Sequence, residues 1–153
     1  IEGAGKVGER YIGIAGIRDP YSIKNIDRVI AWCRKQVQEQ FPGEKYELYF
    51  HIYGKNGVME EWEPVREVRS HELCIVVEGV AATKELAKEI TFCGWMQLFY
   101  ARLPDVKGTA GSAAFITHET IYDGVAYEWT MNHTIPVNNP MDLFKVKFTY
   151  SDE

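Results

Sequence analysis

The chain has 153 residues, of which 46% are hydrophobic and 25% charged, the composition of one ordinary globular domain. Its formal net charge of −5 argues against a nucleic-acid partner, because neutralising phosphates needs a basic surface. No apolar run reaches the roughly 18 residues that span a bilayer, so the sequence predicts no membrane partner either.

The start of the chain lacks both a signal-peptide pattern and an initiator methionine. We therefore expect one domain, residues 1–153, taken from a longer polypeptide or complex. Cys33, Cys74 and Cys93 each lie in an apolar context without CxxC spacing. This usage favours buried free thiols in a reducing cytoplasm over a redox or metal role.

The first half of the chain predicts a strand, a helix and two further strands. Glycines alternate with isoleucines in residues 10–17, which is typical of a strand. Ser22 is expected to cap a helix that extends to Phe41 with one apolar stripe. Residues 46–53 alternate as a half-buried strand does, and the continuous apolar run within 71–80 predicts a central strand.

In the second half, Thr83 is expected to cap a second helix, followed by a short strand at 98–101. Residues 127–137 and 143–148 predict further strands. The order β-α-β-β-α-β defines an α+β, ferredoxin-like fold. Both helices would cover one face of an antiparallel sheet, with extra strands at the C-terminus.

Small residues gather in residues 107–115, where backbone must closely approach another element or a ligand. The spacing matches neither a Walker A loop nor a GxGxxG motif. One interpretation is a tight connector that admits a neighbouring strand. The other is an anion or coenzyme A site. Its candidate ligand-binding residues are Arg102, Lys107, Gly108, Thr109, Gly111 and Ser112.

The catalytic candidates are His51, His133 and Glu78. The two histidines would meet if their strands are neighbours, and such a pair performs acid–base work near neutral pH. Glu78 follows an apolar run, which suits a general base with a raised pKa. An ion pair with Arg18 or Arg102 would instead make it structural. The four histidines lack metal-site spacing, so no metal is expected.

One face of the strand at 46–53 would carry Tyr49, His51 and Tyr53. Such a face can stack nucleic-acid bases, but the negative charge of the chain opposes that use. Burial against a partner domain or subunit explains the same face, so the sequence favours a homo-oligomer.

Several motifs in fixed order resemble the C-terminal ferredoxin-fold region of the acyclic-terpene-utilisation protein A-like family. The resemblance covers nearly the whole chain, from about Gly13 to Phe144. The motifs that carry it are Gly16–Pro20, His51–Val58, His71–Leu73, Glu78–Ala87, Thr109–Ala113, Tyr127–His133 and Asn139–Phe144.

The resemblance implies that a larger N-terminal catalytic domain or subunit accompanies this region. It implies a role in the breakdown of acyclic terpenoids or branched acids, with a lyase or hydratase step on a hydroxyacyl-coenzyme A. The chain would then be an accessory or assembly domain that is not catalytic alone and needs no cofactor beyond a coenzyme A thioester as substrate. The alternative is a stand-alone oligomerisation or protein-interaction module without catalytic activity.

Overall fold

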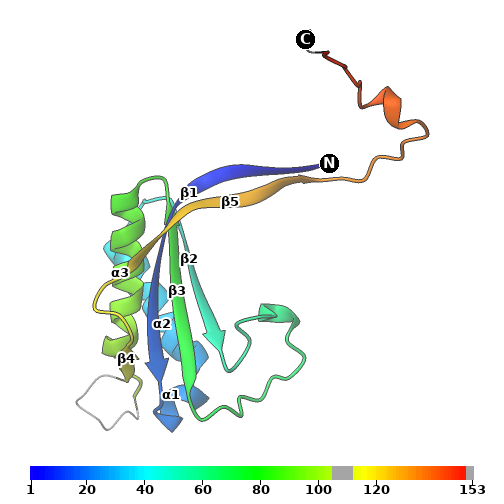
Figure 1. Ribbon diagram of the computed structural model, residues 1–153. Helices are drawn as coiled ribbons and strands as arrows, with labels where there is room; N and C mark the ends of the chain where they lie inside the picture. The colour runs from blue at the N-terminus through cyan, green and yellow to red at the C-terminus, as the bar shows by residue number, and fades with distance from the viewer. Residues whose placement is uncertain (105–111, 151–153) are drawn as a thin grey trace. The chain divides into compact units, whose positions relative to one another are not determined.

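The computed structural model describes residues 1–104 and 112–150 of the chain (Figure 1). The chain divides into two compact units, one of Lys6–Tyr127 and one that joins Ile1–Gly5 with Glu128–Glu153. Two long strands, β1 (Glu2–Ile17) and β5 (Ile121–Asn132), pair with each other and contribute residues to both units.

The unit Lys6–Tyr127 is built on an antiparallel sheet. Besides β1 it contains β2 (Tyr46–Tyr53), β3 (Leu73–Ala81) and the short β4 (Ala113–Phe115). The strands lie in the order β2-β3-β1-β4. With helices between β1 and β2 and between β3 and β4, this is the ferredoxin-like arrangement, and the α+β prediction is confirmed.

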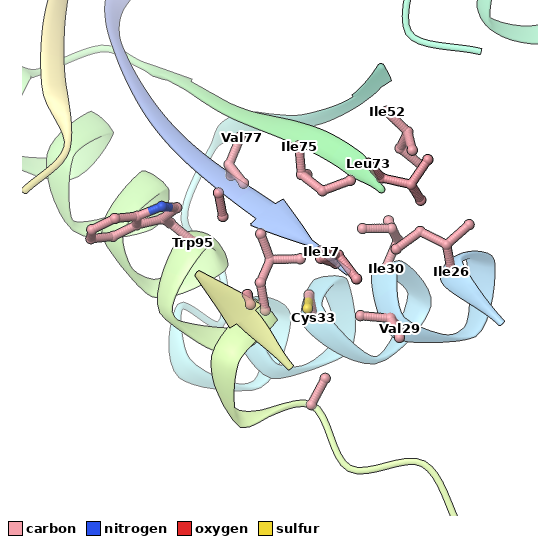
Figure 2. Packing of buried hydrophobic residues seen from close by; sticks show 14 of the residues in the cluster. Ile17, Ile26, Val29, Ile30, Cys33, Ile52, Leu73, Ile75, Val77 and Trp95 are labelled. Atoms are coloured by element: carbon pink, nitrogen blue, oxygen red, sulfur yellow. The ribbon is translucent and has the colours of Figure 1, made fainter. Parts of the chain in front are cut away.

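Three helices, α1 (Pro20–Lys24), α2 (Ile26–Gln40) and α3 (Lys84–Tyr100), pack on the sheet. Figure 2 shows the core that strands β1 and β3 form with α2 and α3. In α2 the buried positions recur at spacings of three and four, so one apolar stripe meets the sheet. The buried core includes Ile17, Val29, Cys33, Val37, Leu73, Ile75, Val77, Ile90, Trp95 and Leu98.

The first predicted helix is divided at Asn25 and begins earlier than its sequence indicates. Asp19, not Ser22, is the N-cap of α1, and its Oδ2 accepts a hydrogen bond from the Ser22 backbone N–H at 2.6 Å. Pro20 occupies the first helical position, where its missing N–H costs nothing. The Ser22 prediction was therefore wrong, because Asp-Pro is the stronger start signal.

Asp19→Ala is expected to lower the free energy of unfolding by about 1 kcal/mol at neutral pH, through loss of the cap. The hydrogen bonds from Ser22 hold the pKa of Asp19 below its ordinary value of 3.8. The cap therefore contributes its full stabilisation above pH 3.8, where Asp19 is ionised in both the folded and the unfolded chain. That stabilisation is lost as the pH falls through the lowered pKa of Asp19 in the folded chain. In urea denaturation, the free energy of unfolding of Asp19→Ala should be clearly lower than that of the parent chain at neutral pH. At about pH 2 the two values should be nearly equal.

Three predicted strands end or run differently. Residues 98–100 are the last turn of α3 rather than a strand, because Leu98 continues the buried face of that helix. The strand predicted at 127–137 begins earlier and ends earlier, as β5. Residues 143–148 alternate in polarity, but the structure pairs them with no strand. Within the single chain, none of the described strands pairs with them.

The smaller unit is a two-stranded ribbon followed by an extended segment. The Ile1 ammonium donates to the His133 carbonyl at 2.7 Å, and the His133 N–H donates to the Ile1 carbonyl at 2.9 Å. Beyond His133 the described residues form only a 3-10 turn at Pro140–Asp142. Across the described residues of both units, no helix is long and apolar enough to cross a membrane.

Candidate functional site

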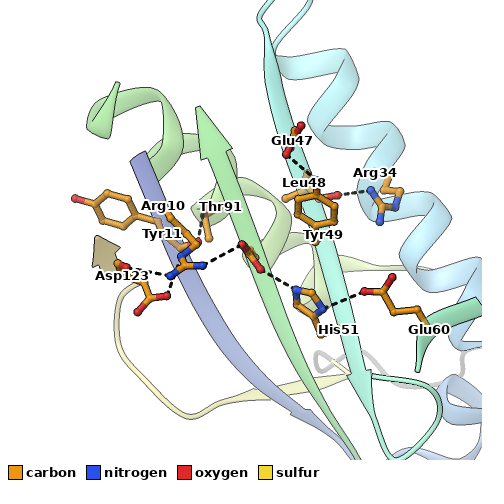
Figure 3. A network of polar contacts seen from close by, with 11 residues as sticks. Arg10, Tyr11, Arg34, Glu47, Leu48, Tyr49, His51, Glu60, Thr91 and Asp123 are labelled. Atoms are coloured by element: carbon orange, nitrogen blue, oxygen red, sulfur yellow. Dashed lines mark hydrogen bonds and ion pairs between the residues drawn. The ribbon is translucent and has the colours of Figure 1, made fainter. Parts of the chain in front are cut away.

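One face of the sheet carries a polar network instead of helices, and we call it the open face. In the register, Glu78 of β3 lies between Tyr49 of β2 and Ile12 of β1. Alternation along the strands places Arg10 and His51 on the same face (Figure 3). Arg10, His51 and Glu78 are partly exposed. Residues such as Ile52 and Val77, which point to the opposite, helix-covered face of the same strands, are buried.

Glu78 is the centre of the network. Its Oε2 lies 2.8 Å from Nε2 of His51, and its Oε1 lies 3.8 Å from Nη1 of Arg10. Arg10 Nε lies 2.9 Å from Oδ2 of Asp123 on β5, an ion pair that does not meet hydrogen-bond geometry. The network therefore links β2, β3, β1 and β5 through alternating acidic and basic side chains (Figure 3).

The second nitrogen of His51 faces another carboxylate. Nδ1 lies 3.7 Å from Oε1 of Glu60, which has an exposed side chain. The backbone φ of Glu60 is 50°, a conformation that side-chain-bearing residues adopt at a cost. Tyr49 stacks on the His51 ring with centroids 6.2 Å apart. Its hydroxyl donates to Glu47, which raises the pKa of Tyr49 to about 12, so the phenol stays neutral.

This geometry holds the strands together more than it prepares a reaction. Both ring nitrogens of His51 are directed at carboxylates, so neither is presented to a substrate. The adjoining cavity, lined by Arg34, Tyr49 and His51 among others, measures about 200 Å³. Sites for drug-sized ligands start at roughly 300 Å³, and a coenzyme A thioester is larger still.

The structure unites two of the three catalytic candidates. His51 and Glu78 form the close pair, but His133 lies in the other unit, at the end of β5. The strands of the two histidines are not neighbours, since β2 pairs with β3 and β5 with β1. The basic partner of Glu78 is Arg10, a residue that the sequence did not single out.

The ligand-binding candidates fall partly outside the described residues, which is where Lys107, Gly108, Thr109 and Gly111 lie. Arg102 is exposed just after α3. Ser112 is half-buried beside β4 and lines a cavity of about 730 Å³ whose described lining does not include Arg102. Beyond Ser112, Ala113 and Ala114 pair with Ile17 and Gly16, as the connector interpretation expects.

The cysteines are free thiols. Cys33 and Cys93 are buried, and burial raises the pKa of the Cys33 thiol to about 12. Cys74 is half-exposed on the open face, so the prediction that all three cysteines are buried is wrong for this residue. Among the described residues, no group of His, Cys, Asp or Glu side chains is placed to hold a metal ion.

Comparisons with protein-family models, curated proteins and solved structures find no match to the chain. The family resemblance carried by the motifs therefore stays a prediction.

Proposed function

We propose that the chain is an assembly domain that holds subunits together through residues 133–150, the C-terminal arm. Every described residue from Tyr127 to Tyr150 is exposed. Disordered segments carry few aromatic and β-branched residues, so the composition of the arm supports burial against other protein. Its exposed large apolar residues are Ile135, Val137, Met141, Leu143, Phe144, Val146, Phe148 and Tyr150.

The partner that best fits the arm is a second copy of the chain. Between Phe144 and Phe148 apolar residues alternate with Lys145 and Lys147, the period of a half-buried strand with one basic side. β2 is an outer strand of the sheet order, so one of its edges has main-chain groups left to pair besides the Leu48 carbonyl, which accepts from Arg34. Exposed Glu47 on β2 would face the lysines if the arm adds as a strand.

Light scattering on the full chain tests this proposal. The parent chain is expected to have the mass of a dimer, because the arm of each copy adds to the sheet of the other. Phe144→Ser with Phe148→Ser should shift the mass to that of a monomer while leaving the circular dichroism of the folded sheet unchanged.

The matched control is Val58→Ser with Trp62→Ser, which removes two apolar side chains that are 83% and 78% exposed in another loop. This variant should keep the dimer mass. A parent chain that is monomeric at every concentration, or equal dissociation by both double variants, would overturn the proposal.

The sequence resemblance supports a more specific form of the proposal. The assembly would serve a catabolic enzyme acting on acyclic terpenoid or branched hydroxyacyl-coenzyme A substrates, with the lyase or hydratase chemistry in a larger partner domain. In this form of the proposal His51 and Glu78 would line the edge of such a site rather than supply its acid–base group, because they are already paired with each other. Titration with a hydroxyacyl-coenzyme A should then move the NMR signals of His51. Unmoved signals would remove this form and leave the assembly proposal standing.

A further inference from the structure

A second cavity, of about 520 Å³, lies away from the open-face network. The turn between β1 and α1, the helix α1, the start of α2 and the connection from β2 to β3 line it, and it opens to solvent. Its volume lies within the range of small-molecule sites. Basic side chains dominate its charged lining, and they are Arg18, Lys24, Lys55, Arg66 and His71.

The acidic residues of this cavity are already engaged. Asp27 is paired with Lys55, and Glu67 is paired with Arg69, which lies outside the cavity. Among the described residues, Arg18 and Lys24 have no hydrogen-bond or ion-pair partner. The cavity is therefore lined by an excess of positive charge, although the whole chain has a net charge of −5. Such a local excess of positive charge attracts an anion.

The remaining charged group, Arg66, uses one guanidinium nitrogen on the Glu61 carbonyl at 3.1 Å. Its other donors and the whole Arg18 guanidinium remain for a ligand. Two guanidinium groups match the oxygens of a phosphate in paired hydrogen bonds, and an ammonium such as Lys24 adds a third positive charge. A dianion therefore satisfies this set better than a single carboxylate.

Apart from Ser70, the rest of the cavity wall is apolar. Pro20 is exposed and Val68 is half-buried, and the nearly buried Ile23 and Ile26, 6% and 2% exposed, complete the lining. Such a wall gives an organic group a surface to bury, whereas a bare inorganic ion would leave it wetted.

We propose that this cavity binds an organic phosphate, with the phosphate on Arg18, Lys24 and Arg66 and the organic body against Ile23 and Val68. The inference does not depend on the assembly proposal, because every residue in it belongs to the unit Lys6–Tyr127.

Phenyl phosphate, inorganic phosphate and benzoate are suitable probes for calorimetry and NMR on the full chain. Phenyl phosphate is expected to bind most tightly, inorganic phosphate more weakly without the apolar contact, and benzoate more weakly with one charge. Shifted amides should map to residues 18–27 and 66–71. The absence of shifts with all three probes, or tighter binding of benzoate than of phenyl phosphate, would overturn the proposal.

Arg66→Ala and Lys45→Ala form a matched pair, since each removes one positive charge from an exposed loop and only Arg66 lines the cavity. Arg66→Ala should weaken phenyl phosphate binding about tenfold, the loss of roughly 1.4 kcal/mol, while Lys45→Ala should leave it nearly unchanged. Equal weakening by the two variants would mean that net charge alone attracts the probe, and the site would be rejected.

Discussion

Trp95→Ala is expected to lower the free energy of unfolding by about 3–5 kcal/mol, the range for truncating a buried aromatic residue. The Trp95 side chain is 1% exposed, and its Nε1 donates to the Ile14 carbonyl at 3.0 Å. Its ring centroid lies 4.1 Å from that of Phe115, so it also fixes the short strand β4 against α3. Alanine would leave a cavity and remove one of the two hydrogen bonds that the Ile14 carbonyl accepts, the other coming from the Ile116 N–H at 3.2 Å.

The loss is large against a typical domain stability of about 5–15 kcal/mol, so the variant should unfold at a much lower urea concentration. Circular dichroism gives the midpoint independently of tryptophan fluorescence. Trp62→Ala is the control, because that side chain is 78% exposed and should change the midpoint little. Similar losses for the two variants would contradict the packing described for α3.

Gly79→Ala is expected to cost about 1–3 kcal/mol by overpacking the contact between β3 and α3. A Cβ at this position would lie 2.2 Å from Oγ1 of Thr91 and 3.3 Å from the Ala87 carbonyl. Thr91 is fully buried and its hydroxyl donates to that same carbonyl at 2.6 Å, so it has no free direction in which to move. The helix itself must shift.

A double-mutant cycle with Thr91→Ala tests this cause, because removing the hydroxyl makes room for the new methyl group. The Gly79→Ala cost should shrink in that background, measured by urea denaturation. Gly94→Ala is the control in α3, where the nearest atom is a flexible Leu48 methyl at 3.3 Å. Independent, additive costs of Gly79→Ala and Thr91→Ala would show that the hydroxyl is not the obstacle.

Much of this fold can be predicted from local sequence patterns. The alternation in β2, the stripe of α2 and the Thr83 cap, whose Oγ1 accepts from the Leu86 N–H, can be read within a few residues. Errors arise where two local signals compete. Leu98 and its neighbours are apolar and aromatic enough for a strand, but packing against the sheet extends α3 through them.

The open-face network depends on information that no local pattern contains. Arg10, His51 and Glu78 come from three strands, and only the register brings them together. Glu78 was recognised from its apolar surroundings and His51 from its type, but their contact follows from β2 pairing with β3. Arg10 carried no signal beyond its place as the first residue of the strand predicted at 10–17.

The hydrogen bonds between Ile1 and His133 also bear on the order of folding, because they close a loop of 132 residues. Loop-closure entropy for such a span is about 4 kcal/mol, which two main-chain bonds do not offset. β1 and β5 each run from the larger unit into this ribbon, so prior folding of Lys6–Tyr127 shortens the search. The pairing of Ile1 with His133 is therefore expected to follow the folding of Lys6–Tyr127 rather than to precede it.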